Sequence, residues 1–262
     1  MKPTLSLFVA WHSEQPSPRW GPIGRVDALR VSATETRYRF CYTEGARLIE
    51  GFRPFDGMED LEMVYHSDEL LPMLANRVLS ESRPEYADFL RWHGFDPADP
   101  PEPLLLLQRS EGIKQTDAIE VFPCPVPDDQ GCYLNFFFVH GMRFHLNNPE
   151  VAATVAKLHP GDRLTLRCEP DNPEDPFAVA IDAEGIPIGY APRYLAHDVT
   201  RLMRECPEGS VQLFVQRVNP DAPFQQRLLC RMRGCWPAGF RPCTGPEFEL
   251  IPEVAGDLVE SG

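Results

Sequence analysis

The sequence predicts an α+β fold in two parts: a small N-terminal sheet with a helical pair, then a small, closed or partly closed β-barrel with two short helices. Three observations support this prediction. Short β-rich runs divided by proline and glycine clusters fill residues 5–43, apolar residues at helical spacing follow within 67–92, and five or six short strand patterns occupy 132–235. Many short strands with few helices are typical of a sandwich or barrel.

In the N-terminal part, the runs LSLFVAW, GRVDALRV and TRYRFCY are expected to be antiparallel strands because turn-rich segments separate them. Apolar residues at helical spacing predict a first helix over 70–79 and a second through 86–92, with a proline break between them. The apolar run PLLLLQRS at 103–110 and the run DAIEVFP at 117–123 are expected to be two further strands.

A proline-rich segment, 124–131, is the predicted linker, which gives an N-terminal domain of residues 1–123 and a second domain of residues 132–245. The second domain begins with the run YLNFFFVHGMRF, which predicts a buried strand. A short helix is expected at 150–158 and another that begins near 193. The runs DRLTLRC, FAVAID, IPIGYAP, SVQLFVQRV and QQRLLCRMRG are the remaining predicted strands.

Composition places the chain among ordinary folded proteins, with 262 residues of which 43% are hydrophobic and 24% charged. No apolar stretch approaches the roughly 20 residues of a membrane-spanning helix, and the apolar run near the N-terminus is short and broken for a signal sequence. We therefore expect a cytoplasmic protein without membrane contact. Its eight cysteines include no CxxC pair, so reduced and mostly buried thiols are expected.

Charge is distributed unevenly along the chain, whose net charge is −14. Residues 1–130 are strongly acidic, residues 131–245 hold 12 basic and 12 acidic side chains, and residues 246–262 hold five acids and no base. The last segment is expected to be an acidic, solubilising tail. Phosphate contacts depend on Lys and Arg, so the neutral second half, whose end is rich in arginine, is the part expected to bind nucleic acid.

A motif in the second half resembles the HIRAN domain. The run GDRLTLRCEPDNPEDPFAVAIDAEGIPIGYAP carries an NPxDxxA core and paired glycines, Gly185 and Gly189, and Arg143-Phe144 precede it in the expected order. The resemblance covers about residues 133–235 and implies a variant OB-like barrel. In the best-understood type of member, the domain holds the 3′-hydroxyl end of single-stranded DNA.

Several residues of this sequence match the ligand-binding positions of the family, and the resemblance therefore implies a nucleic-acid site. Arg143 would meet a phosphate and Phe144 a base, while Asn172 and Asp175 would approach the terminal nucleotide. Tyr190, in the glycine hairpin, and Arg193, which follows it, complete the candidate set. An aspartate can accept the hydrogen bond of a free 3′-hydroxyl, and a ring stacks on a base for about 1 to 3 kcal/mol.

Glu174 stands where the DNA-end-binding member has a second aromatic residue. A carboxylate there repels phosphate, and we expect weak, salt-sensitive binding.

Each of these residues also has a purely structural interpretation. Asn172 and Asp175 suit Asx turns, in which the side chain accepts hydrogen bonds from backbone two residues on. Arg143 could form a surface ion pair, and Phe144 could belong to the core. These alternatives remain open from the sequence alone.

The N-terminal half resembles, more weakly, the N-terminal subdomain of HipA-type toxin kinases. The resemblance rests on the runs GRVDAL, TRYRFCYTEGARLI, GFRPF and ELLPMLANRVLSESRPEY. No catalytic aspartate motif, phosphate loop or activation segment follows them, so a complete kinase is excluded by the sequence. The resemblance implies a protein-binding role, with a kinase as partner.

Metal binding and catalysis have little support in the residue pattern. Cys230, Cys235 and Cys243 are separated by four and seven residues, so that a zinc site would need a fourth ligand from elsewhere, and His140 and His145 on one strand would point to opposite faces. No cofactor is expected, with zinc as a minor alternative. No nucleophile elbow, Walker loop or HExxH motif occurs in the sequence.

Three hypotheses for function follow from these observations. The first is a non-enzymatic protein whose second domain recognises single-stranded or damaged DNA or a free 3′ end, in DNA repair, processing or defence. The second is an antitoxin-like or regulatory protein in which both halves bind protein, with a HipA-type kinase as partner. The third is an accessory subunit of an ATPase or nuclease acting on nucleic acid.

Overall fold

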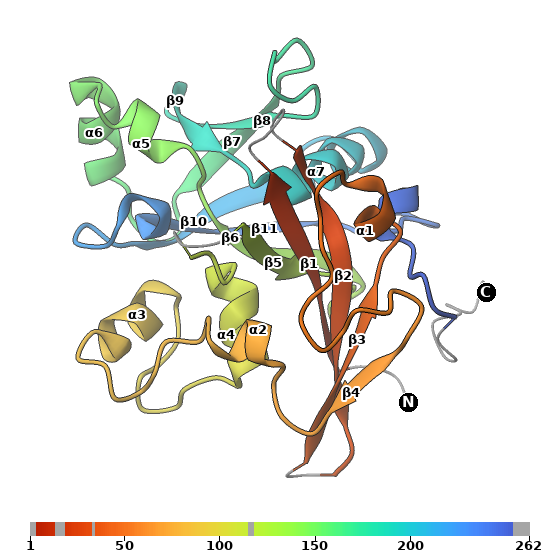
Figure 1. The fold of residues 1–262 in the computed structure, drawn as a ribbon. Coiled ribbons are helices and arrows are strands. Elements are labelled where there is room, and N and C mark those ends of the chain that lie inside the picture. Colours follow the sequence, from red (N-terminus) through yellow and green to blue (C-terminus); the bar gives the residue numbers. More distant parts are fainter. Residues whose placement is uncertain (1–3, 14–18, 33–34, 115–117, 254–262) are drawn as a thin grey trace. The chain divides into compact units, whose positions relative to one another are not determined.

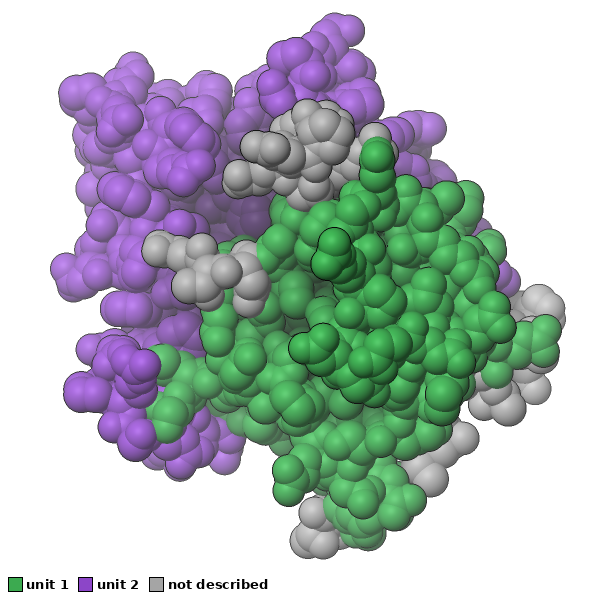
Figure 2. Space-filling model, in the orientation of Figure 1, with its two compact units in different colours: residues 1–80, 101–124, 243–262 green, residues 81–100, 125–242 purple. Residues whose placement is uncertain are grey.

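Two antiparallel sheets organise the protein, and the computed structural model describes residues 4–13, 19–32, 35–114 and 118–253 (Figure 1). The chain divides into two compact units. Unit 1 comprises residues 1–80, 101–124 and 243–262, and unit 2 comprises residues 81–100 and 125–242 (Figure 2). The predicted α+β class is confirmed.

Unit 1 contains a five-stranded sheet with the order β4-β3-β2-β1-β5. Its strands are β1 (Leu5–Ser13), β2 (Arg19–Arg30), β3 (Thr36–Tyr42), β4 (Tyr65–Ser67) and β5 (Ile119–Pro123). The pairing of β1 with β2 opposes Leu7 to Val26, and both side chains are fully buried. Residues that oppose each other across antiparallel strands share one face, so the register itself creates the buried face.

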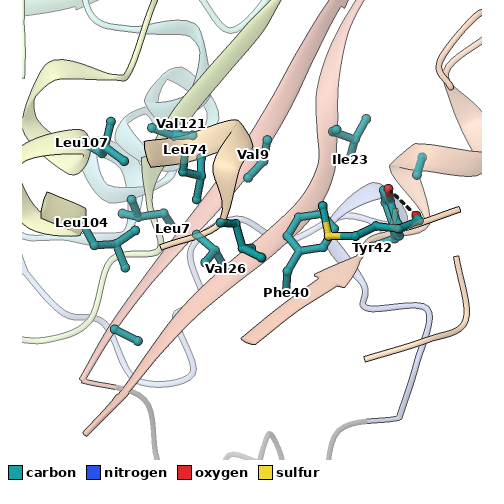
Figure 3. Packing of buried hydrophobic residues seen from close by; sticks show 14 residues of the cluster. Leu7, Val9, Ile23, Val26, Phe40, Tyr42, Leu74, Leu104, Leu107 and Val121 are labelled. Carbon is teal, nitrogen blue, oxygen red and sulfur yellow. Dashed lines mark hydrogen bonds between the residues drawn. The ribbon is translucent and has the colours of Figure 1, made fainter. Parts of the chain in front are cut away.

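The core of unit 1 lies on this face and includes residues from two helices, α2 (Pro72–Ala75) and α4 (Pro103–Ser110) (Figure 3). Leu74 from α2 and Leu107 from α4 are fully buried together with Phe40 and Val121 of the sheet. At one side of the core the hydroxyl of Tyr42 donates a hydrogen bond of 2.9 Å to the Met58 carbonyl. The buried phenol therefore has the partner that it needs.

Two predictions in unit 1 are wrong. The run 103–110 is the helix α4 rather than a strand, because Pro103 suits the first helical turn and Leu104 and Leu107 then fall on one buried face. The helix expected over 70–79 is only the single turn of α2. A further short helix, α1 (Gly45–Leu48), follows β3.

The described part of the expected acidic tail packs on unit 1. The turn η2 (Pro246–Phe248) places the Phe248 ring 5.1 Å from that of Phe8, and the Glu44 amide donates to the Glu249 carbonyl at 2.8 Å. A solubilising extension is therefore the wrong description of residues 246–251, because their apolar side chains alternate with the acids and are partly buried. Residues 254–262 lie outside the described part of the chain.

Unit 2 contains a six-stranded sheet with the order β6-β11-β10-β7-β8-β9. Its strands are β6 (Cys132–Phe138), β7 (Arg163–Cys168), β8 (Val179–Ala183), β9 (Ile186–Tyr190), β10 (Gln212–Val218) and β11 (Leu228–Cys235). The first residues of β7 pair with β10 and its last four pair with β8, so β7 joins two halves of the sheet.

The two edges of this sheet meet at one point. Just beyond β6, His140 exchanges two backbone hydrogen bonds of 2.9 Å with Tyr190 at the end of β9. A single bridge links strands that would be fully paired in a closed barrel. The strand pattern left a closed or a partly closed barrel open, and the described strands form a sheet that is only partly closed.

The helices of unit 2 are α3 (Tyr86–Trp92), α5 (Met142–His145), α6 (Pro149–Ala156) and α7 (Arg193–Glu205), with a short turn η1 (Phe224–Gln226). The strand expected to run through Phe144 ends at Phe138, and Gly141, at φ 72°, precedes α5. The argument that placed His140 and His145 on one strand is thus wrong. For α6, the Asn148 side chain accepts from the Glu150 amide at 2.9 Å, which caps the helix as expected of this residue type.

The structural division differs from the predicted domain boundaries at α3. Residues 81–100 cluster with unit 2, where the His93 ring packs edge-on against Phe138 at 5.1 Å and the Asn219 side chain donates to the Trp92 carbonyl at 3.0 Å. One change of unit along the chain, between Cys124 and Pro125, falls within the predicted linker.

A disulfide joins Cys206, at the end of α7, to Cys235, at the end of β11, with the two Cα atoms 5.9 Å apart. The expectation that all thiols are reduced is therefore wrong at this pair. The other six cysteines form no disulfide in the described part of the chain, and burial strongly raises the pKa of the Cys230 thiol, which is inert in consequence.

Candidate nucleic-acid interface

Helix α5 presents a cation and an aromatic ring together at the surface of unit 2. Gly141 adopts the left-handed conformation that turns the chain after β6, and buried Met142 anchors the helix. The next two side chains then point outward. Phe144 is 70% exposed, and the Arg143 guanidinium lies 4.5 Å from its ring centroid.

This arrangement decides two of the open alternatives. Phe144 does not belong to the core, and Arg143 forms no ion pair with any described residue. An exposed ring beside an unneutralised guanidinium offers a stacking surface and a phosphate contact in one place.

The loop between β7 and β8 is built on Asx turns. The Asn172 side-chain oxygen accepts from the amides of Glu174 at 3.0 Å and Asp175 at 3.3 Å. Asp175 in turn accepts from the Phe177 amide at 2.9 Å. The structural interpretation of Asn172 and Asp175 is therefore confirmed, because both side chains hold the loop in shape.

Glu169 connects this loop to the sheet. Its carboxylate accepts hydrogen bonds from the Asn172 side-chain amide at 3.0 Å, the Tyr190 hydroxyl at 3.2 Å and Arg167 at 2.7 Å. The hydrogen bond from Asn172, helped by those from Arg167 and Tyr190, holds the pKa of Glu169 below its usual range. Burial, and next the charge of Glu169, raise the pKa of Tyr190, so its hydroxyl remains a donor.

Sequence reasoning missed Glu169 as a member of the site. The signal was present, because Glu169-Pro170 opens the same turn-rich motif that contains Asn172 and Asp175. An acid at that position reads as a solvated turn residue unless its partners are known. Those partners include Tyr190, 21 residues away.

Arg193 closes the loop from the other side. It is the first residue of α7, and its guanidinium lies 3.4 Å from the Asp175 carboxylate and donates to the Glu174 carbonyl at 3.0 Å. Asn172, Asp175, Tyr190 and Arg193 are thus linked through Glu169 and the loop backbone in one cluster.

Tyr190 is the point at which the two parts of the site meet. Helix α5 packs beside β9, with the His145 ring centroid 5.9 Å from that of Tyr190 (Figure 1). The bridge between His140 and Tyr190 fixes the backbone that leads into α5. The structure therefore brings the six predicted residues to neighbouring positions, although no direct contact between Phe144 and the Asn172 loop is present among them.

A second exposed ring accompanies the site, and sequence reasoning did not single it out. Phe177 follows the Asx turns, is 44% exposed, and packs edge-on against His197 of α7 with 4.9 Å between ring centroids. Glu174, the carboxylate at the position of a family aromatic residue, is exposed in the same loop. Phe177 therefore supplies the only aromatic side chain of residues 169–178, three residues further along.

Neither a metal centre nor a membrane segment is found in the described ranges. No group of three His, Cys, Asp or Glu side chains there could hold a metal ion, and Cys235 is bonded to Cys206. Within those ranges every helix is too short or too polar to cross a membrane.

Comparison with known proteins gives one family and two solved structures. The sequence model of the HIRAN domain matches residues 133–233. A crystal structure of a protein from Lactobacillus plantarum is 21% identical, with 39% of this chain and 96% of that chain covered and a TM-score of 0.31. The crystal structure of the HIRAN domain of human HLTF is 17% identical, with 41% and 83% covered and a TM-score of 0.30. No curated protein matches the chain.

The family match confirms the prediction for the second half of the chain. The matched residues contain α5, the Asx loop, β9 and α7, and therefore every candidate site residue. They do not include the N-terminal half, where the resemblance to the HipA subdomain stays a prediction. Residues 133–233 of this protein form a HIRAN domain.

Proposed function

We propose that this protein is a non-catalytic nucleic-acid-binding protein whose HIRAN domain receives the free 3′ end of a single strand at the site formed by α5, the Asx loop and β9. The observation that carries the proposal is the exposed pair Arg143 and Phe144 beside Tyr190. A base stacks on Phe144, and Arg143 meets the adjoining phosphate.

The Asx loop supplies the end-specific contact. One oxygen of Asp175 accepts from the Phe177 amide, and the other lies at the long distance of 3.4 Å from Arg193. That second oxygen has room to accept the hydrogen bond of a free 3′-hydroxyl. A 3′-phosphate would instead meet the carboxylates of Asp175 and Glu174, which repel it.

Affinity is expected to be low and to fall as the salt concentration rises. The exposed cations of the site, Arg143 and Arg193, stand against Glu174 and Asp175, and the whole chain carries −14. A plot of log affinity against log salt concentration has a slope of roughly −0.7 for each phosphate contact on a single strand. Because the site offers few such contacts, this slope should be small.

Fluorescence anisotropy tests the proposal with two labelled single strands that differ only in a free or phosphorylated 3′ end. We expect tighter binding of the free end, and a loss of roughly fivefold or more in the variant Phe144→Leu, which keeps an apolar side chain but removes the stacking ring. Arg204→Gln is the matched control, because Arg204 is an exposed helical arginine of the same unit outside the site.

Equal affinity for the two ends would refute end recognition, and absence of binding at low salt would refute nucleic-acid binding altogether. Partnership with a HipA-type kinase, and service as an accessory subunit of an ATPase or nuclease, stay predictions, because no contact within the described part of the chain favours either.

A further inference from the structure

A row of alternating aromatic and cationic side chains crosses the outer face of the unit 2 sheet. Phe136 of β6 opposes Arg231 of β11, Arg231 opposes Phe214 of β10, and Phe214 opposes Arg163 of β7. Directly opposed residues of antiparallel strands project to the same face. The Arg231 guanidinium lies 5.8 Å from the Phe214 ring centroid, in keeping with this register.

This row lies on the solvent side of the sheet. Arg163 and Arg231 are exposed and the two phenylalanines are half-buried, whereas their strand neighbours Leu213 and Met232 are buried on the opposite face. A second row lies beside it, in which Leu134 opposes Arg233 and Arg233 opposes Gln212. We call Phe136, Leu134, Arg231, Arg233, Phe214 and Arg163 the Arg–Phe face.

The charge of the Arg–Phe face is unusual for a protein whose net charge is −14. The four strands β6, β7, β10 and β11 contain five arginines and no aspartate or glutamate. Of the arginines on the face, Arg163 and Arg231 form no ion pair or side-chain hydrogen bond with any residue described in the structure, and Arg233 bonds only to Gln130 and Cys132. The face is therefore complementary to a polyanion.

The covered and open parts of the same sheet surface differ in chemistry. One step along the strands, Leu229 opposes Phe138, and this apolar pair is buried, with His93 packed on the Phe138 ring. The segment 81–100 of unit 2 thus covers the purely apolar end. At the other end, Arg163, Arg231 and Arg233 are exposed and Phe214 is half-buried between them, which is the pattern of a binding face rather than of an unfinished core.

Strand β7 connects this face to the proposed 3′-end site. Arg163, Thr165 and Arg167 are exposed at alternate positions and so point the same way, and Arg167 bonds Glu169 of the site. At the usual rise of a strand, Arg163 and Arg167 are about 13 Å apart, and the row of four strands is about 14 Å wide. A single strand leaving the end site has a continuous path of this length to the Arg–Phe face.

We propose that the Arg–Phe face is a second, sequence-independent contact for single-stranded nucleic acid, which holds the nucleotides that precede the 3′ end. A base stacks on Phe214, and Arg163 and Arg231 meet phosphates or stack on bases. The inference rests on the proposed function, since it takes the same strand whose end the loop site receives.

Anisotropy with two oligothymidines of about 4 and about 16 nucleotides, the range of lengths that OB folds occupy, tests this inference. The wild-type protein should bind the long strand at least roughly tenfold more tightly than the short one. Phe214→Leu should weaken the long strand by roughly fivefold or more and leave the short one unchanged. In Arg163→Gln/Arg231→Gln the salt slope for the long strand should fall by roughly 1.4, and Arg204→Gln again is the control.

The outcomes separate this inference from the proposed function. If the short strand binds and lengthening it adds no affinity, the Arg–Phe face is refuted while the end site stands. If only the long strand binds, and Phe144→Leu has no effect, the end site fails and the face stands. Equal weakening of both strands by Phe214→Leu, or displacement of the long strand by a poly-glutamate peptide as readily as by unlabelled oligothymidine, would overturn the inference.

Discussion

Replacement of Gly189 by alanine should open the partly closed sheet of unit 2 and displace Tyr190 from the proposed site. A Cβ atom at Gly189 would lie 2.4 Å from the His140 carbonyl oxygen and 2.5 Å from Cγ1 of Val139. Real Cβ atoms do not approach backbone so closely, and the backbone must therefore move. The group that moves is the bridge in which His140 and Tyr190 exchange two hydrogen bonds of 2.9 Å.

The magnitude follows from those two bonds. Each backbone hydrogen bond that is broken without replacement costs about 1 to 3 kcal/mol, so loss of the two bonds of the bridge should destabilise unit 2 by about 2 to 6 kcal/mol. Gly185→Ala is the matched control. Gly185 lies at the other end of β9 with nothing near its added Cβ, and its φ of 82° limits the cost to about 1 to 2 kcal/mol.

Thermal unfolding followed by circular dichroism measures the difference. At the middle of the two ranges, about 4 and about 1.5 kcal/mol, Gly189→Ala should melt about 5 to 10 °C below Gly185→Ala, since a destabilisation of 1 kcal/mol lowers Tm by about 2 to 4 °C in a chain of this size. Its affinity for a single strand with a free 3′ end should also fall, because Tyr190 holds Glu169 in place. Equal melting temperatures for the two variants would refute the close approach at Gly189 as a determinant of closure.

Three further predictions concern charge and covalent structure. Asp27→Asn should lower the free energy of unfolding, measured by urea denaturation, by about 3 to 5 kcal/mol. The reason is that the buried Arg39 guanidinium, 2.6 Å from the Asp27 carboxylate, loses this anionic partner. A loss no larger than that from breaking an exposed pair such as Arg91–Asp88 would contradict this prediction. Because the folded-state pKa of Glu169 is depressed, its contribution to stability is present above the unfolded-state pKa and is lost as the pH falls through the folded-state value. Glu169→Gln should therefore flatten the fall of Tm below about pH 4.3, and an unchanged acid profile would argue against the network. The disulfide Cys206–Cys235 closes a loop of 29 residues, and its reduction should lower the free energy of unfolding by about 3 to 4 kcal/mol. As the control, the double variant with serine at both positions should have the same melting temperature with and without reductant.

Sequence reasoning succeeded where periodicity and turn residues act locally. The alternation in RLTLRC and the glycine turn before IPIGYAP predicted β7 and β9, and the helix expected at 150–158 corresponds to α6. The motif around Asn172 identified the HIRAN domain, because its Asx turns need those residue types at that spacing. These features depend on neighbours within a few residues, which the sequence displays directly.

Prediction from the sequence failed where an apolar run is compatible with both a strand and a helix. The four leucines of 104–107 suit a buried strand as well as a helix, and only the packing of Leu104 and Leu107 with Leu74 and Val121 shows which form is present. In the same way, the apolar run YLNFFFVHGMRF, which ends at Phe144, predicts a single strand. The turn at Gly141 is stabilised by the bridge to Tyr190, a partner some 50 residues away in the chain that no local pattern reveals.

The sequence alone determined the α+β class, most of the strands and the HIRAN motif, and it supplied the six candidate residues of the proposed 3′-end site. The tertiary structure decided which side chains share a surface. Strand register set Phe136, Arg231, Phe214 and Arg163 in one row, and chain reversal brought Tyr190 to Glu169 and Cys206 to Cys235. The reason is physical: spacing along a chain fixes the face on which a residue lies, but only the pairing of distant strands fixes its neighbour across that face.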